Sequence, residues 1–345
     1  MTNTQADLIA RHRDLIAKEP KMRARDLAHK LEISEAELVS LGKEGAVTTR
    51  LTADWPAIIS AVSKVGRVMA LTRNESCVHE RKGIYGKLEG GAHVGLIVSD
   101  DIDLRIFFSH WRFGFAVVEG ERRSLQFFDA SGMAVHKIYA TDTTDLAAFD
   151  KLISDFTLID NTPLDIIAAS PKALPLPDSE IDVGAFHNSW DALTATHQFH
   201  GLLGKYKLAR VQALRLAGQE RATPVPAQSL RHVLMSAADQ NTPIMVFVGN
   251  HGMIQIHTGP VSNLKPMGPW FNVMDEAFNL HLREDHIANA YVVRKPTDDG
   301  VVTSLELFDA DGETIATLFG KRKPSQPEDL AWREIVEDLC AKEAA

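Results

Sequence analysis

The spacing of apolar residues along this chain changes from a helical to a strand-like pattern. From residue 1 to about Leu41, leucines and isoleucines recur at roughly helical spacing, which predicts helices. From Val68 onward, short runs rich in β-branched and aromatic residues are separated by Gly, Asp or Ser, which predicts strands. These runs are residues 68–71, 93–98, 104–108, 113–118, 125–128 and 135–139. Since no long helical segment separates them, we expect an antiparallel sheet.

The second half of the chain repeats both this order and part of the sequence. Residues 124–139 read SLQFFDASGMAVHKIY, and residues 304–319 read SLELFDADGETIATLF, an offset of 180. Residues 74–83 align with residues 250–259 at an offset of 176, so a short insertion such as 297–300 explains the difference. A repeat this long indicates a duplicated domain rather than a solenoid. Duplicated halves that pack together are expected to leave a cleft between them.

The expected fold class is therefore α+β, with two similar halves that each combine an antiparallel sheet and helices. The first repeat covers residues 1–168, including a helix and its exit at 145–168. Residues 169–181 form a linker, because three prolines fall within 169–178. The second repeat covers residues 182–345, with helices at about 182–240, strands at 244–319 and a final helix near 329–344. The glycines of DASG at 129–132 and DADG at 309–312 suit hairpin turns, since glycine readily adopts a positive φ.

Composition narrows the possible partners. A length of 345 residues is enough for two domains, and the net charge of −9 disfavours a nucleic-acid-binding surface, which needs a basic face. The two cysteines, Cys77 and Cys340, lie in no metal-binding or disulfide motif, which is typical of a reducing compartment. No signal peptide, lipidation motif or membrane-spanning apolar run is present in the sequence. We expect a cytoplasmic protein that does not insert into a membrane.

Residues 25–38 resemble the core of a helix-turn-helix. Ser34 followed by Glu37 has the spacing of a capping box and predicts the start of the second helix. A DNA-reading helix would open with Arg, Lys, Asn or Gln, whereas this one opens with Ser-Glu-Ala-Glu. The segment is better interpreted as a packed pair of helices, and a DNA-binding regulator remains the alternative function.

Candidate chemistry is concentrated in two segments. In residues 190–218, His197 and His200 are three apart and would share one face of a helix. Two histidines alone are typical of surface or core positions, and the further ligands of a zinc site are missing nearby. In residues 74–118, Arg105 lies inside a predicted strand among aromatic residues. Such an arginine needs an anion or a hydrogen-bonding partner, and Asp101 or Asp103 could be that partner.

Motifs in both halves show a resemblance to a known family. The first half contains LTRN at 71–74, CVHE at 77–80, DIDLR at 101–105, Trp111 with GFAV at 114–117, and LQFFD at 125–129. The second half contains THQF at 196–199, VRKP at 293–296, TSLELFD at 303–309, and FG at 319–320 with Arg322. In this order the motifs resemble the HemS/HmuS family of cytoplasmic haem-utilisation proteins, also called hemin-degrading factors.

The resemblance implies that haem b (iron protoporphyrin IX) is held in the cleft between the halves, each a large antiparallel sheet with flanking helices. His197 matches the axial ligand of the iron, and Arg105 matches an arginine on the distal side. The other matched positions would meet the propionates or line the porphyrin, and they are Arg210, Lys295 and Arg322, and Phe107 and Phe199. This set agrees with haem chemistry, which asks for an imidazole, cations and apolar walls.

Two further histidines are candidate iron ligands. His200 lies one turn after His197 and could act as an alternative ligand, or it could bond solvent or a propionate. His79, in CVHE, could offer a weaker second site in the first half, although a structural role is favoured for it.

The predicted function is haem binding in a bacterial-type haem uptake and iron acquisition system. The protein would receive haem from an importer and either pass it to a downstream oxygenase or reductase, or open the ring itself. Since no flavin or nicotinamide motif is present, degradation would need an external reductant. In that case Arg105 would be the catalytic distal residue. A structural protein without a ligand is a third interpretation.

Overall fold

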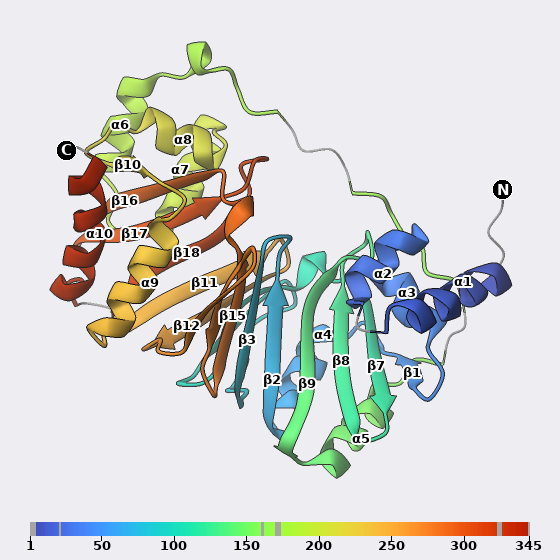
Figure 1. Cartoon of the computed structure of the whole chain (residues 1–345). Coiled ribbons are helices and arrows are strands. Elements are labelled where there is room, and N and C mark those ends of the chain that lie inside the picture. Colours follow the sequence, from blue (N-terminus) through green and yellow to red (C-terminus); the bar gives the residue numbers. More distant parts are fainter. Residues whose placement is uncertain (1–4, 21, 160–161, 170–173, 323–325, 344–345) are drawn as a thin grey trace. The chain divides into compact units, whose positions relative to one another are not determined.

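The computed structural model describes residues 5–20, 22–159, 162–169, 174–322 and 326–343 (Figure 1). The chain forms two compact units: unit 1 comprises Met1–Thr72, Lys82–Ser170 and Asn250–Met253, and unit 2 comprises Arg73–Arg81, Pro171–Gly249 and Ile254–Ala345. Each unit therefore contains a short segment that belongs to the other half of the sequence. Parts of the expected first helix, linker and last helix, namely residues 1–4, 170–173 and 344, lie outside the described residues.

Unit 1 combines an antiparallel sheet with helices. In order across the sheet its strands are β1 (Val47–Arg50), β7 (Phe113–Glu119), β8 (Arg122–Phe128), β9 (Ala134–Thr144) and β2 (Gly66–Arg73). A second antiparallel group contains β4 (Glu89–Gly90), β5 (Val94–Val98) and β6 (Asp103–Phe107). The helices are α1 (Gln5–Lys18), α2 (Ala24–Leu31), α3 (Glu35–Leu41), α4 (Trp55–Val62) and α5 (Leu146–Asp155). The predicted α+β class is confirmed.

Unit 2 has the same arrangement of elements. Its main strands, in order, are β10 (Ala222–Val225), β16 (Asn289–Thr297), β17 (Gly300–Phe308), β18 (Thr314–Gly320) and β11 (Ile244–Asn250). A second group contains β3 (Cys77–Ile84), β15 (Phe278–Arg283), β14 (Trp270–Met274) and β13 (Leu264–Met267), and β12 (Met253–Gly259) completes the strands. The helices are α6 (Val183–Asp191), α7 (Gln198–Tyr206), α8 (Arg210–Leu216), α9 (Ser229–Asp239) and α10 (Leu330–Glu343).

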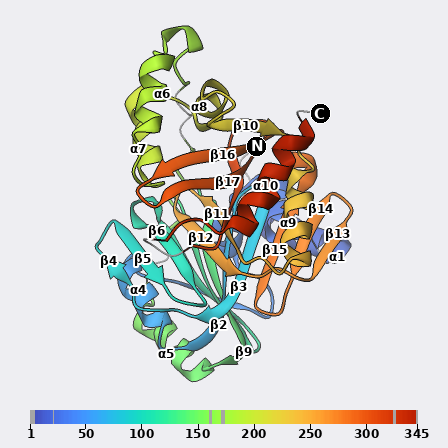
Figure 2. The same cartoon turned by 90° about the vertical axis from the view of Figure 1, so that its left-hand side faces the viewer.

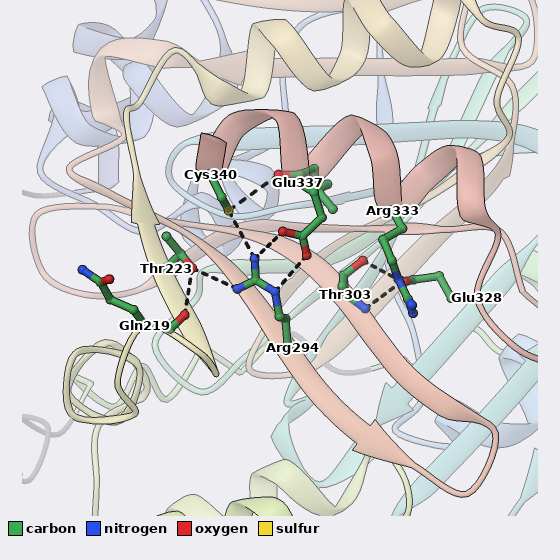
Figure 3. A network of polar contacts seen from close by, with 9 residues as sticks. Gln219, Thr223, Arg294, Thr303, Glu328, Arg333, Glu337 and Cys340 are labelled. Carbon is green, nitrogen blue, oxygen red and sulfur yellow. Dashed lines mark hydrogen bonds and ion pairs between the residues drawn. The ribbon is translucent and has the colours of Figure 1, made fainter. Parts of the chain in front are cut away.

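Two long helices cover the main sheet of unit 2. Figure 2 shows α9 and α10 side by side, and the apolar faces of both contribute to one core with β11, β17 and β18. Polar contacts hold α10 against β16: Arg294 of β16 donates to both oxygens of Glu337 of α10, at 2.9 and 2.7 Å (Figure 3). Arg294 also donates to the Thr223 hydroxyl of β10 at 2.9 Å. Such a bidentate pair orients the helix as well as holding it.

The duplication is visible in the backbone of the two units. Helices α2 and α7 both end at a residue in the left-handed conformation, Glu32 (φ 60°) and Lys207 (φ 53°). In both units the next helix begins three residues after this position, at Glu35 and at Arg210. The predicted hairpin turns are confirmed, because Gly132 and Gly312 both have φ 77°. In each turn the glycine N–H donates to the aspartate carbonyl three residues earlier.

Two asparagines hold the exchanged segments in the same way. Asn74, next to β3, donates through its side-chain nitrogen to the carbonyl of Ile315 at 2.9 Å. Asn250 donates equivalently to the carbonyl of Val135 at 2.9 Å. Residues 74 and 250 are the first pair of the 176-residue offset, and residues 135 and 315 follow the 180-residue offset. The exchange of segments is therefore part of the duplicated architecture.

Candidate functional site

A single glutamine side chain organises the turn that precedes α7. The Oε1 atom of Gln198 accepts hydrogen bonds from the backbone N–H groups of Thr194 (2.9 Å) and Ala195 (3.3 Å), and its amide nitrogen donates to the Thr194 hydroxyl (3.0 Å). His197 is the N-cap residue of α7, and its side chain makes no capping hydrogen bond. The residue is exposed. The fold thus leaves this imidazole at the surface rather than in the core.

Buried aromatic rings anchor α7 from below. The side chain of Phe199 is 2% exposed, and its ring meets that of Trp190 edge-on, with 4.8 Å between centroids and 75° between planes. The indole N–H of Trp190 donates to the carbonyl of Arg294 at 3.0 Å. Because this aromatic pair is both packed and hydrogen-bonded, it fixes the start of α7 relative to β16.

Two cations lie over the Phe199 ring and share one carboxylate. The guanidinium carbon of Arg210 is 5.1 Å from the ring centroid, and the Nζ atom of Lys295 is 4.6 Å from it. Arg210 donates through Nε to one oxygen of Glu306 at 2.7 Å, and Lys295 donates to the other oxygen at 2.6 Å. The side chains of Lys295 and Glu306 are 3% and 0% exposed, whereas that of Arg210 is 28% exposed. This cluster lies entirely within unit 2.

The two cations set the ionisation of Glu306. Burial alone would raise the pKa of this carboxyl group, but Arg210 and Lys295 outweigh burial and lower the pKa to about 2. For Lys295, burial lowers the pKa, and Glu306 opposes that change. The cluster is therefore a buried ionic group whose parts depend on one another for their charge.

Arg322 offers a further cationic group just after β18. Its side chain is partly buried, and its Nη1 atom is buried without a hydrogen-bond partner among the residues that the structure describes. A buried donor without a partner costs about 1–3 kcal/mol. An anionic group bound at this nitrogen would remove that cost.

In unit 1, Arg105 lies on β6 and forms an ion pair with Asp103 of the same strand. Asp103, Arg105 and Phe107 alternate with the buried residues Leu104 and Ile106, so these three share the partly exposed face. Burial raises the pKa of Asp103, and the nearby Arg105 only partly opposes that rise. The aspartate that the sequence offered as a partner is thus the partner in this structure.

Comparison with known proteins decides the family. A family model for the haemin-degrading HemS.ChuX domain matches residues 32–156 and 207–339, which is more than half of the chain. The chain belongs to this family. It is 41% identical to hemin transport protein HmuS of Yersinia pestis, over 95% of this chain and 96% of that protein.

Solved structures agree with this membership of the HemS family. The chain is similar to holo-PhuS, a heme-binding protein from Pseudomonas aeruginosa, with a TM-score of 0.92 and 46% identity over 97% of this chain and 99% of that one. It is also similar to ChuS, described as an E. coli heme oxygenase, with a TM-score of 0.86 and 39% identity over 96% and 99%.

The two additional histidines have different environments. His200 is exposed on α7, three residues after His197. His79 is completely buried on β3, where its ring lies 5.0 Å from that of Phe278. The ring of Phe278 is also stacked by that of His257, with 3.7 Å between the ring centroids. An iron could reach His79 only if this packing opened, which agrees with the structural role favoured for it from the sequence.

The helix-turn-helix-like segment uses its acidic residues within the fold. Ser34 and Glu37 form the predicted capping box at the start of α3. Glu35 forms an ion pair with Lys137 of β9, with 2.9 Å between the two charged atoms, and both side chains are mostly buried. These contacts support the interpretation as a packed helical pair, and no observation favours DNA binding.

Sequence reasoning missed Glu306, which joins two of the predicted binding residues. Its signal was a charged residue between Leu305 and Leu307 in an otherwise apolar strand, a position that requires a buried partner. Within the described ranges there is no group of three or more His, Cys, Asp or Glu residues able to hold a metal ion directly. No helix in the described part of the chain is long and apolar enough to cross a membrane.

Proposed function

We propose that this protein binds haem b through His197 and serves haem utilisation in the cytoplasm. The observation that carries the proposal is the start of α7 in unit 2, where the exposed His197 precedes by two residues the buried Phe199, whose ring lies beneath two cations. Haem needs an imidazole for its iron, cations for its propionates and an apolar surface for its ring. Membership of the HemS family and the similarity to holo-PhuS support the same ligand.

Each residue of the cluster has a role in this proposal. His197 supplies the iron ligand, and because its side chain is exposed at the start of α7 it needs no rearrangement of the core to do so. Arg210, Lys295 and Arg322 bind the propionates, and Phe199 supports the site from below. Arg105 and Phe107 are proposed for the distal side, supported by their shared, partly exposed face on β6. There Arg105 would exchange part of its contact with Asp103 for a ligand.

A hemin titration followed by the Soret absorption tests the ligand assignment. Wild-type protein should saturate at one equivalent. We expect His197→Ala to keep residual binding through His200, and the double variant His197→Ala/His200→Ala to lose the Soret band of the complex. Complete loss in His197→Ala alone would show that His200 is no alternative ligand. A second equivalent that disappears in His79→Ala would establish the second site.

A reductant separates degradation from transport. The hemin complex is incubated with a physiological reductant and catalase, which removes free peroxide. Degradation releases stoichiometric iron and a linear tetrapyrrole while the Soret band decays, and Arg105→Ala should then slow the decay more than it weakens binding. Haem that survives unless peroxide accumulates would support a carrier that receives haem from an importer and passes it to another protein.

A further inference from the structure

Among the residues that the structure describes, Glu306 forms an ion pair with each of the two cations of the cluster, one through each carboxylate oxygen. Oε2 accepts from Arg210 at 2.7 Å, and Oε1 accepts from Lys295 at 2.6 Å. The Ser304 hydroxyl donates to Oε1 at 3.1 Å and fixes the carboxylate plane. A carboxylate bound on both oxygens in this way acts as a bridge, so it sets the separation and the orientation of the two cations.

The bridge leaves the cluster with unused binding capacity. Two positive groups and one negative group give a net charge of one positive. Arg210 uses only Nε toward Glu306, and its two terminal nitrogens bond to none of the residues that the structure describes. Since Arg210 is the one member with an exposed portion, the free edge of its guanidinium is the accessible face of the cluster. That edge can hold one carboxylate with two parallel hydrogen bonds.

We infer that Glu306 is a positioning residue for haem: it holds Arg210 and Lys295 together above Phe199 as a receptor for a single propionate. This inference rests on the proposed function, and it assigns the second propionate to a different cation. Arg322, with its buried and unpaired Nη1 among the described residues, is the group available for that second carboxylate.

Removing the negative charge of Glu306 has a consequence that a purely structural residue would not share. Lys295 is buried and close to Arg210, and both conditions favour its neutral form, whereas Glu306 favours the charged form. In Glu306→Gln, Lys295 would therefore release its proton at a lower pH. The affinity for a carboxylate ligand would fall with it.

Unit 1 supplies a matched control at the equivalent place. Gln126 occupies the position equivalent to Glu306 at the 180-residue offset. Glu35 opens α3 as Arg210 opens α8, and it pairs with Lys137. Glu35→Gln thus removes a mostly buried carboxylate from a lysine pair without touching the proposed site.

The experiment measures the dissociation constant of hemin from about pH 6 to about pH 9 for wild type, Glu306→Gln and Glu35→Gln. The affinity should fall as the pH rises and Lys295 loses its proton. We expect the midpoint of this fall to lie about one pH unit or more lower in Glu306→Gln than in wild type, because a neighbouring opposite charge shifts a pKa by about one to three units. Glu35→Gln should follow the wild-type curve. Haem dimethyl ester, which has no carboxylate, should show no difference between wild type and Glu306→Gln.

A second variant covers the case in which Glu306→Gln does not fold. Lys295→Met/Glu306→Gln removes both charges of one pair, so it leaves no unneutralised ammonium in the core. It should bind hemin about tenfold more weakly than wild type, which corresponds to the loss of one charge-assisted hydrogen bond. Because it has no Lys295 to titrate, its affinity should not show the fall at lowered pH that is expected for Glu306→Gln. If either variant has the wild-type midpoint, or if the dimethyl ester shows the same shift, the role of Glu306 is refuted. If wild-type protein does not bind hemin at all, the proposed function itself fails.

Discussion

Acid should destabilise unit 1 through one buried histidine, His136 of β9. Its side chain is 1% exposed, and each ring nitrogen has a partner: Nδ1 lies 2.9 Å from the Thr72 hydroxyl and Nε2 lies 2.6 Å from the Tyr85 hydroxyl. Burial lowers the pKa of His136 from 6.5 to about 3, and a backbone contact with Leu71 opposes this only weakly. A proton on this ring would place an unpaired charge in a core of aromatic residues.

The sign and size of the effect follow from this shift. Between the folded pKa of about 3 and the unfolded value of 6.5, the unfolded chain binds a proton that the folded chain does not. The stabilisation by His136 is therefore complete above pH 6.5 and is lost as the pH falls toward 3. At about 1.4 kcal/mol per pKa unit, the loss is about 2 kcal/mol between pH 7 and pH 5, and it approaches about 5 kcal/mol near pH 3.

The measurement is native-state hydrogen exchange of β9 amides at about pH 7 and about pH 5, corrected for intrinsic exchange. We expect His136→Gln to be less stable than wild type at pH 7 but to lose about 2 kcal/mol less on acidification. His257→Gln is the control, because burial also lowers the pKa of His257, to about 4, but this residue belongs to unit 2. Its substitution should leave the acid response of β9 unchanged. An unchanged acid response in His136→Gln would refute the reasoning.

Two substitutions test the turn and the anchor of the predicted elements. Gly132→Ala should lower the free energy of unfolding in urea by about 2 kcal/mol or more, because φ is 77° and the new Cβ would lie 2.3 Å from the Ser34 hydroxyl. Gly120→Ala is the control: φ is 58° there, but no atom lies within 4 Å of the new Cβ, so the loss should be about 1 kcal/mol. Trp190→Phe should cost about 0.5–1.5 kcal/mol, because the partly buried carbonyl of Arg294 loses the hydrogen bond from the indole. The same variant should weaken hemin binding, measured by Soret titration, since it loosens α7.

Local patterns predicted much of the fold. The two hairpins and the α3 capping box follow from residues close together in sequence, and the structure confirms them. Strand β3 (Cys77–Ile84) was not predicted, because charged residues interrupt its apolar pattern. Its place depends on pairing with β15, about 200 residues later, which no local pattern can reveal. Phe108 was predicted at a strand end but lies in a 3₁₀ turn, Phe108–His110, where its ring enters the core.

The candidate site shows the same limit. Phe199, Arg210 and Lys295 were selected by resemblance, and the structure brings these three together within unit 2. The connection between them is Glu306, and it was missed because strand periodicity gives the face of a residue but not its partner on another element. A charged residue in an apolar strand is the signal to examine in such cases.

The exchanged segments have a consequence for how the chain is made. Unit 1 includes Asn250–Met253, which emerge from the ribosome long after the rest of that unit. The indole N–H of Trp111 donates to the carbonyl of Gly252 in this segment at 3.0 Å. Strand β3 is synthesised early, but the edge that pairs with β15 stays unpaired until that later strand has been made. A gene cut at the proline-rich segment would therefore yield two products that each lack a piece of their own sheet or core. Selection would keep both halves on one polypeptide even if the ligand required only one of them.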